Sequence, residues 1–424
     1  MTKQIQPGVT VTTISTKKFK TIRILVRFTT RHSAKTAAAR TLLTSLLETN
    51  SLHFPTQTAL SKELAALYGA SFGINVAKKG NLHQVNVSMN VVNGNYVGDE
   101  NLFTQVLSFL KEILFSPNIT NERFDEQTFQ LEQENLMAYL GSLEEDKQTW
   151  ASLQVQELYF ADDVDQKIPS FGTMAGVREC TATSLVATYQ SMLQEDQVDI
   201  FVVGDISANE VEQAFESWDW PKTERVHPEI FSEFDVTNVI REKTVIEPVV
   251  QAKLNLAYHL DVYYDDVFRF PAMVFNGLFG GFSHSKLFLN VREKESLAYY
   301  ASSNLDLFRG MVTVQTGIDS KNRNRVLKLI HEQLDALKRG EITPLELQQT
   351  KERIKTQYYL GKDYAQNLME KVYYEAWLPK AKKSEEQWLE ELAAVTKEDV
   401  QQLANRLSLQ AIFFLEGEDE HGEA

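Results

Sequence analysis

The chain has 424 residues, of which 43% are hydrophobic and 24% charged, a composition typical of a globular protein too long for one ordinary domain. Its 43 lysines and arginines against 58 aspartates and glutamates give a formal net charge of −15, which repels nucleic-acid phosphate and anionic lipid. We therefore expect neither nucleic acid nor a membrane as a partner. A cytoplasmic location is expected, because the N-terminus lacks the apolar core of a signal peptide, no stretch approaches a membrane span, and the single cysteine, Cys180, excludes an internal disulfide framework.

The first half of the chain alternates strand and helix patterns. Residues 21–30, TIRILVRFTT, alternate apolar side chains with arginines, as a strand with one buried face does. A helix-forming stretch follows at 37–51, and residues 72–92 predict a β-hairpin. An amphipathic helix, a long charged helix and an apolar closing strand, IFVVGDI at 200–206, complete this half.

The second half repeats this order. Its opening strand is VVQAKLNLAYHL at 249–260, and its hairpin pattern covers 299–318. An amphipathic helix ends at Gly340, and a long helix begins at TPLE, where Thr343 is the cap and Glu346 completes a capping box. The closing strand is IFFLEGED.

The repeated order predicts an internal duplication. Gly204 and Gly417 lie 213 residues apart, and the opening strands at Thr21 and Val249 lie 228 apart. We expect an α+β fold of two duplicated domains, each a mostly antiparallel sheet packed by helices. The predicted boundaries are an N-terminal domain at 1–222, a linker at 223–239 and a C-terminal domain at 240–424, whose last, acidic residues we expect to fray.

Residues 277–300, GLFGGFSHSKLFLNVREKESLAYY, contain one dense motif. It resembles the signature L-G-G-G-x-S-S-R-L-F-x-x-V-R-E-K-x-G-L-A-Y of the pitrilysin/insulinase/mitochondrial-processing-peptidase superfamily. The matching residues are Leu278, Gly280, Gly281, Ser283, Ser285, Lys286, Leu287, Phe288, Val291, Arg292, Glu293, Lys294, Leu297, Ala298 and Tyr299. The duplication and the VVGDI strand also fit, so the resemblance covers essentially the whole chain.

Active members of that family are zinc peptidases with an H-x-x-E-H helix in the first half and a later glutamate as third ligand. In this chain the corresponding helix places Thr41, Thr44 and Ser45 at the His, Glu and His positions, and the looser match at the third ligand gives Tyr139. None of these side chains is a useful zinc ligand. Because the eight histidines contain neither H-x-x-E-H nor H-E-x-x-H, we expect no metal, no cofactor and no catalytic residue.

The resemblance implies that Arg292 and Tyr299 hold substrate backbone, facing the zinc site across a closed chamber. A guanidinium offers a fork of donors to peptide carbonyls, and a phenol can donate to a carbonyl that gains negative charge. Gly280 and Gly281 are further substrate-binding candidates, because the resemblance implies that a glycine-rich loop guides substrate. The alternative is structural: Arg292 pairs with a nearby glutamate, Tyr299 packs on the sheet, and the glycines allow close packing.

Two main functions remain open, with a weaker third. The favoured one is a non-catalytic peptidase homologue that binds peptide or an unfolded protein segment and completes the chamber of a zinc-bearing partner subunit. The second is a stand-alone peptide-binding or scaffold protein, with a second copy of itself as partner. The third is an active metallopeptidase with an unrecognised site.

Overall fold

A computed structural model describes residues 1–417, which form two compact units; the predicted fraying of the acidic end concerns residues outside this range. Unit 1 contains Met1–Ser142, Ile168–Ile230 and Tyr364–Tyr373, and unit 2 contains Leu143–Lys167, Phe231–Asp363 and the chain from Tyr374 onward. Each unit therefore takes a segment from the other half of the chain. Between Glu216 and Arg241 the structure has no helix or strand. Among residues 1–417, no helix is long and apolar enough to cross a membrane.

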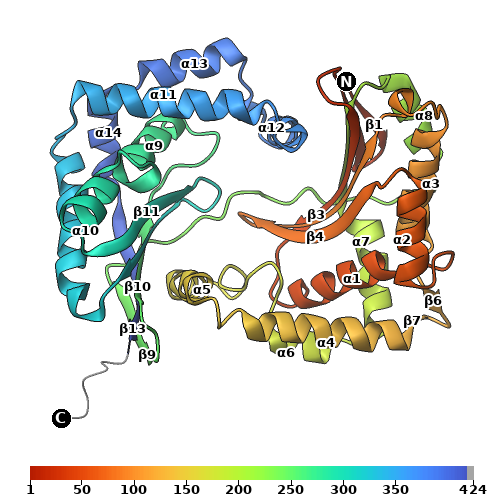
Figure 1. The fold of residues 1–424 in the computed structure, drawn as a ribbon, viewed down its shortest axis with the longest axis horizontal. Coiled ribbons are helices and arrows are strands. Elements are labelled where there is room, and N and C mark those ends of the chain that lie inside the picture. Colours follow the sequence, from red (N-terminus) through yellow and green to blue (C-terminus); the bar gives the residue numbers. More distant parts are fainter. Residues whose placement is uncertain (418–424) are drawn as a thin grey trace. The chain divides into compact units, whose positions relative to one another are not determined.

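Unit 1 is built on a six-stranded sheet of order β1-β2-β8-β3-β5-β4, in which only β2 and β8 pair in parallel (Figure 1). Its strands are β1 (Thr2–Gln6), β2 (Val9–Ser15), β3 (Thr21–Arg31), β4 (Ser71–Lys79), β5 (Leu82–Val92) and β8 (Gln197–Gly204), with a separate pair β6 (Ile119–Thr120) and β7 (Arg123–Phe124). Its helices are α1 (Ala37–Thr49), α2 (Gln57–Ala66), η1 (Gly94–Tyr96), α3 (Leu102–Phe115), α4 (Glu126–Ser142), α6 (Met174–Glu179), α7 (Ser184–Glu195), α8 (Ala208–Glu216) and the first part of α12 (Ala365–Trp377).

Unit 2 is built on a five-stranded sheet of order β11-β12-β10-β13-β9, in which only β13 and β9 pair in parallel. Its strands are β9 (Arg241–Glu247), β10 (Ala252–His259), β11 (Ala298–Asp306), β12 (Met311–Ile318) and β13 (Ser408–Gly417). Its helices are α5 (Lys147–Tyr159), α9 (Arg269–Asn276), η2 (Gly277–Gly281), η3 (Leu287–Lys294), η4 (Ser320–Asn322), α10 (Arg323–Lys338), α11 (Pro344–Gly361), the end of α12, η5 (Pro379–Ala381), α13 (Glu385–Ala394) and α14 (Lys397–Ala404).

The two sheets have the same topology, which confirms the predicted duplication and the α+β class. The order β2-β8-β3-β5-β4 in unit 1 matches β9-β13-β10-β12-β11 in unit 2, and in each the one parallel pair lies at the same place. Alternation explains both sheets, because apolar residues two apart on β3 or β10 reach one face, which the helices cover. The capping box predicted at Thr343 and Glu346 is also present.

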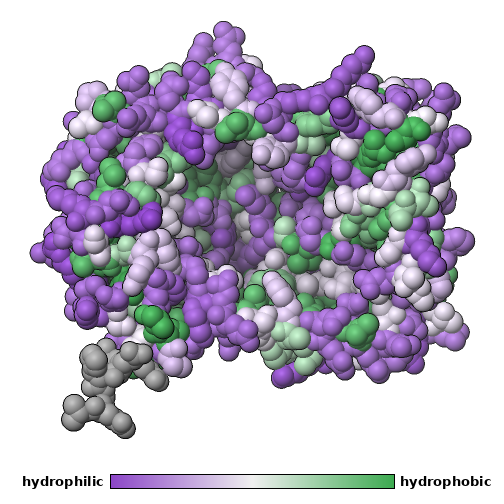
Figure 2. Space-filling view, in the orientation of Figure 1, coloured by the Kyte–Doolittle hydropathy of each residue, from purple (hydrophilic) through white to green (hydrophobic). Residues whose placement is uncertain are grey.

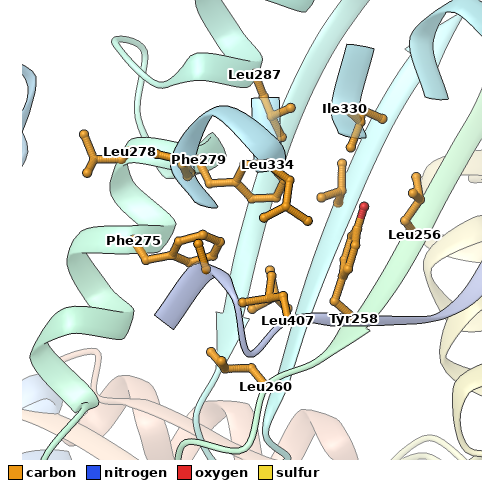
Figure 3. Packing of buried hydrophobic residues seen from close by; sticks show 14 of the residues in the cluster. Leu256, Tyr258, Leu260, Phe275, Leu278, Phe279, Leu287, Ile330, Leu334 and Leu407 are labelled. Atoms are coloured by element: carbon orange, nitrogen blue, oxygen red, sulfur yellow. The ribbon is translucent and has the colours of Figure 1, made fainter. Parts of the chain in front are cut away.

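The core of unit 2 lies between its sheet and helices α9, α10 and α14 (Figure 3). Leu256 and Tyr258 of β10 point into it, together with Leu260 just after the strand and with Phe275 and Phe279. A smaller apolar cluster on the opposite face of the sheet contains residues of α5, β10 and β13. Helix α5 precedes the linker in sequence, so unit 2 is completed by a helix from the N-terminal half. Polar side chains cover most of the visible surface of each unit (Figure 2).

Candidate functional site

Arg292 lies on a π-helical segment, a feature that the sequence did not predict. Residues Leu287–Lys294 form η3, which follows a shorter π-helical turn, η2, at the glycines. Leu287 and Val291 are fully buried in the core, and this anchors one face of η3. Such helices are rare and occur frequently at functional sites. The segment therefore fixes the backbone of Arg292 firmly against the sheet.

The Arg292 side chain lies at the surface of unit 2 with local partners. Its guanidinium carbon is 4.6 Å from the centroid of the Phe288 ring, and its Nε is 3.5 Å from Oε1 of Glu293. The side chain keeps 42% of its surface exposed. A cation–π contact and an exposed ion pair of this kind are each worth about 1 kcal/mol or less. These contacts orient the guanidinium and leave it able to donate to a ligand.

Tyr299 is exposed because of a β-bulge at the start of β11. Ala298 pairs with Ile318 and Tyr300 with Gly317, so Tyr299 is an extra residue without a partner on β12. A bulge redirects the side chain that it contains, and 61% of Tyr299 is exposed. The neighbouring Tyr300 differs in that its hydroxyl has a partner: it donates to Oε1 of Gln148 on α5. Within the described residues, no hydrogen bond or ring contact joins Arg292 to Tyr299.

The turn between Arg292 and Tyr299 is strained at Ser296. Its φ of +53° lies in the left-handed region, where the family signature has glycine. We expect Ser296→Gly to stabilise the protein by about 0.5–1 kcal/mol, because relief of strain exceeds the added entropy of an unfolded glycine. Thermal unfolding measures this. The same change at Ser302, an extended residue of β11, should destabilise; a loss of stability with Ser296→Gly would contradict the explanation.

The two candidate glycines differ in their surroundings. A Cβ on Gly280, which is buried, would lie 2.5 Å from the backbone nitrogen of Ser303, so close packing against β11 is enough to require glycine. Gly281 is exposed, and a Cβ there would lie 2.9 Å from Nδ2 of Asn276. A role of these glycines in guiding substrate stays a prediction.

The positions that correspond to the zinc motif and its third ligand hold side chains with hydroxyl groups, two of which donate to carbonyls of their own helix. Thr41 and Thr44 on α1 are buried; Oγ1 of Thr41 donates to the carbonyl of Ala37 at 2.9 Å, and Oγ1 of Thr44 donates to the carbonyl of Thr41 at 2.7 Å. Ser45 is half-buried on the same helix. Tyr139, on α4, is 52% exposed, and its ring meets that of Phe171 edge-on at 6.2 Å.

These residues do not fit zinc. Hydroxyl groups of Thr, Ser and Tyr lack the imidazole and carboxylate donors that hold Zn²⁺ in proteins. Among residues 1–417, no group of three or more His, Cys, Asp or Glu side chains is arranged to hold a metal ion. Cys180 is a buried thiol whose pKa is raised by burial, and Nε2 of His284 lies 2.9 Å from Oγ1 of Thr350.

Comparison with known proteins agrees with this geometry. Residues 179–354 match the family model described as "Peptidase M16 inactive domain". The chain is 34% identical to "Probable inactive metalloprotease YmfF" of Bacillus subtilis, over 97% of this chain and 96% of that protein. The chain belongs to the M16 peptidase family. The family is the one that the motif predicted, and the relative that matches almost the whole chain is described as a probable inactive metalloprotease.

Other M16 relatives extend the comparison. "Uncharacterized zinc protease YmxG" of B. subtilis is 30% identical, over 56% of this chain and 58% of that protein. The chain is 53% identical in sequence to a conserved protein from Enterococcus faecalis V583, whose crystal structure superposes with a TM-score of 0.95 and 99% of each chain covered. A peptidase M16 inactive domain structure from Pseudomonas fluorescens shares the fold, with a TM-score of 0.80 at 16% identity over 99% of this chain and 98% of that one.

Beside the degenerate ligand positions, this M16 homologue has a buried polar network that sequence reasoning missed. His83 on β5 accepts a hydrogen bond from Nε of Arg40 at its Nδ1, at 3.0 Å, so its Nε2 carries the proton and donates to the carbonyl of Ser170 at 2.8 Å. Burial, and then the charge of Arg40, holds the pKa of His83 well below its usual value. Arg40 in turn pairs with Asp196, and a neutral imidazole is therefore fixed between α1 and the segment at Ser170.

Proposed function

We propose that this M16 homologue is a non-catalytic subunit that binds a peptide segment through Arg292 and Tyr299 and completes the chamber of a zinc-bearing M16 partner. The observation that best supports the proposal is the contrast between two sets of positions. Thr41 and Thr44, at two of the positions of the lost zinc motif, donate to carbonyls of their own helix, whereas Arg292 and Tyr299 match the family residues and have exposed donor groups. A residue kept only for packing has no need of a bulge that exposes its phenol.

The chemistry of this pair suits peptide binding without catalysis. Arg292 offers planar N–H donors to carbonyl oxygens of an extended peptide, and the Tyr299 hydroxyl offers one more. Neither group needs a metal in its own chain. Zinc and the general base would come from the partner, for which a relative such as the B. subtilis zinc protease is a model.

The first test is affinity purification of the chain at its native expression level. A partner with an H-x-x-E-H motif, co-eluting in equal amount, is the expected result. Recovery of the chain as a homodimer without any such homologue would favour the alternative of a stand-alone peptide-binding or scaffold protein. Elemental analysis tests the third alternative, because an active metallopeptidase with its own unrecognised site would hold one zinc per isolated chain.

A second test uses the reconstituted pair with site variants. Arg292→Ala removes a charge-assisted hydrogen bond and should weaken peptide binding and cleavage roughly tenfold, and Tyr299→Phe should weaken them less. Thermal stability should hardly change, because both side chains are exposed. The matched control is Arg325→Ala, which removes another exposed arginine of unit 2 that pairs with a glutamate at 3.3 Å. Unchanged cleavage by the Arg292 and Tyr299 variants, with the partner still bound, would show that the motif is an inherited packing feature.

A further inference from the structure

A polar face of the unit 1 sheet contains two similar rows of side chains that cross strands β3, β5 and β4. In the first row Arg27 is opposite Asn86, which is opposite Asn75. In the second row Arg23 is opposite Asn90, which is opposite Ser71. Residues four apart on a strand point to the same face, so both rows lie on one side of the sheet.

The first row shows how this face binds a carboxylate. Nη1 and Nη2 of Arg27 donate to the two carboxylate oxygens of Glu370, at 3.1 and 2.5 Å, and Nε donates to Oδ1 of Asn86 at 2.7 Å. Nδ2 of Asn86 donates to Oδ1 of Asn75 at 3.3 Å. Glu370 comes from the part of α12 that belongs to unit 1. A glutamate side chain from a helix outside the sheet therefore neutralises Arg27 in this row.

The second row has the same residue types on β3 and β5 but no carboxylate. In the described part of the chain, the Arg23 side chain makes no hydrogen bond, ion pair or ring contact, and its Nε is buried without an acceptor. Asn90 is half-buried and Ser71 is exposed beside it, and neither side chain has a hydrogen-bond partner among the described residues. A buried N–H without an acceptor costs about 1–3 kcal/mol. This row therefore lacks an acceptor for the Arg23 guanidinium.

Glu370 cannot serve both rows. Its two oxygens are already bonded to Arg27, and positions four apart on a strand are separated by about 13 Å. Among the described residues no other carboxylate pairs with Arg23, so we look for the second anion in another molecule. Guanidinium, amide and hydroxyl donors in one line match the oxygens of a carboxylate, and a carboxylate binds an arginine fork through two parallel hydrogen bonds.

We propose that Arg23, Asn90 and Ser71 form a carboxylate-binding site for a polypeptide ligand, with Arg23 as the anchoring cation. The ligand presents either an acidic side chain or its C-terminal carboxylate to the row. This site is on unit 1 and does not rest on the function proposed for Arg292 and Tyr299 on unit 2. It would make the chain selective for acidic segments even though its own net charge is −15.

The test is an array of octapeptides probed with the full chain. Each sequence is present with Glu and with Gln at one position, and with a free and an amidated C-terminus. Sequences selected on the array are then titrated in solution by fluorescence anisotropy. Wild-type protein should bind the carboxylate form roughly tenfold more tightly than its amide counterpart. Preference for Glu over Gln identifies a side-chain carboxylate, and preference for a free C-terminus identifies the terminal one.

Variants of the chain decide whether Arg23 is responsible. Arg23→Ala should abolish the preference, and Arg23→Lys should retain part of it, because the charge stays while the fork is lost. Arg31→Ala is the matched control: it removes an exposed arginine of the same strand and should keep the full preference. Unchanged melting temperatures show that each variant is folded. The proposal is overturned if wild-type protein shows no preference for carboxylates, or if Arg23→Ala keeps it.

Discussion

Replacing Asp196 by alanine should lower the free energy of unfolding of unit 1 by about 3–5 kcal/mol. Oδ2 of Asp196 lies 2.6 Å from Nη2 of Arg40, its Oδ1 accepts from Nη1 at 3.3 Å, and both side chains are almost fully buried. Without the carboxylate, the hydrogen bond to His83 is the one that the buried guanidinium keeps among residues 1–417. The loss is large because an uncompensated buried charge remains, and it does not measure the net worth of the pair.

Urea denaturation compares this variant with a surface control. Asp219→Ala breaks an ion pair with Lys111 in the same unit, in which the aspartate is 91% exposed, and should cost about 1 kcal/mol or less. Removing both members of the buried pair, by Arg40→Met with Asp196→Leu, should restore much of the loss. Equal effects of Asp196→Ala and Asp219→Ala would mean that the Arg40 charge is satisfied in some other way.

The sequence predicted the repeated sheets because alternation is a local signal. Val85, Val87 and Met89 of β5 alternate with polar residues, and the structure places them in the core of unit 1. Which sheet a helix packs against depends on residues far from it in the sequence. The periodicity of α5 or α12 shows that each helix has an apolar side, but not which sheet it covers, so the segments that the two halves exchange could not be predicted.

The sequence names Arg292 and Tyr299 as candidates, but the local geometry around them could not be predicted from it. The motif named Arg292 and Tyr299, yet no sequence pattern distinguishes the i→i+5 bonds of η3 from an ordinary helix. The bulge at Tyr299 could not be predicted either, because it depends on how β11 aligns with β12 and not on the sequence of β11 alone. Arg23 and Arg27 were both visible as polar residues of one strand, but only the presence of Glu370 beside Arg27 shows that the two arginines differ.

The second large effect concerns Glu370, which attaches the first part of α12 to the unit 1 sheet. The Arg27 side chain is only 4% exposed, its guanidinium carbon is 4.5 Å from the centroid of the Tyr373 ring, and the Tyr373 hydroxyl accepts from Nε2 of Gln84 at 2.9 Å. Glu370→Ala should lower the stability of unit 1 by about 2–3 kcal/mol, less than the loss at Asp196 because Glu370 itself is 25% exposed.

Hydrogen exchange shows where this loss occurs. Because Glu370 and Tyr373 attach the same helical segment, amides of residues 365–373 should exchange faster in Glu370→Ala, whereas those of β10 in unit 2 should be unaffected. Glu352→Ala, which breaks an exposed pair with Lys355 on α11, is the matched control and should change neither. Unaltered exchange in 365–373 would mean that the buried side chains of the segment, Met369 and Tyr373, hold it without the carboxylate. In that case the Arg27 row would be a weak model for carboxylate binding at Arg23, so this experiment also bears on the site proposed there.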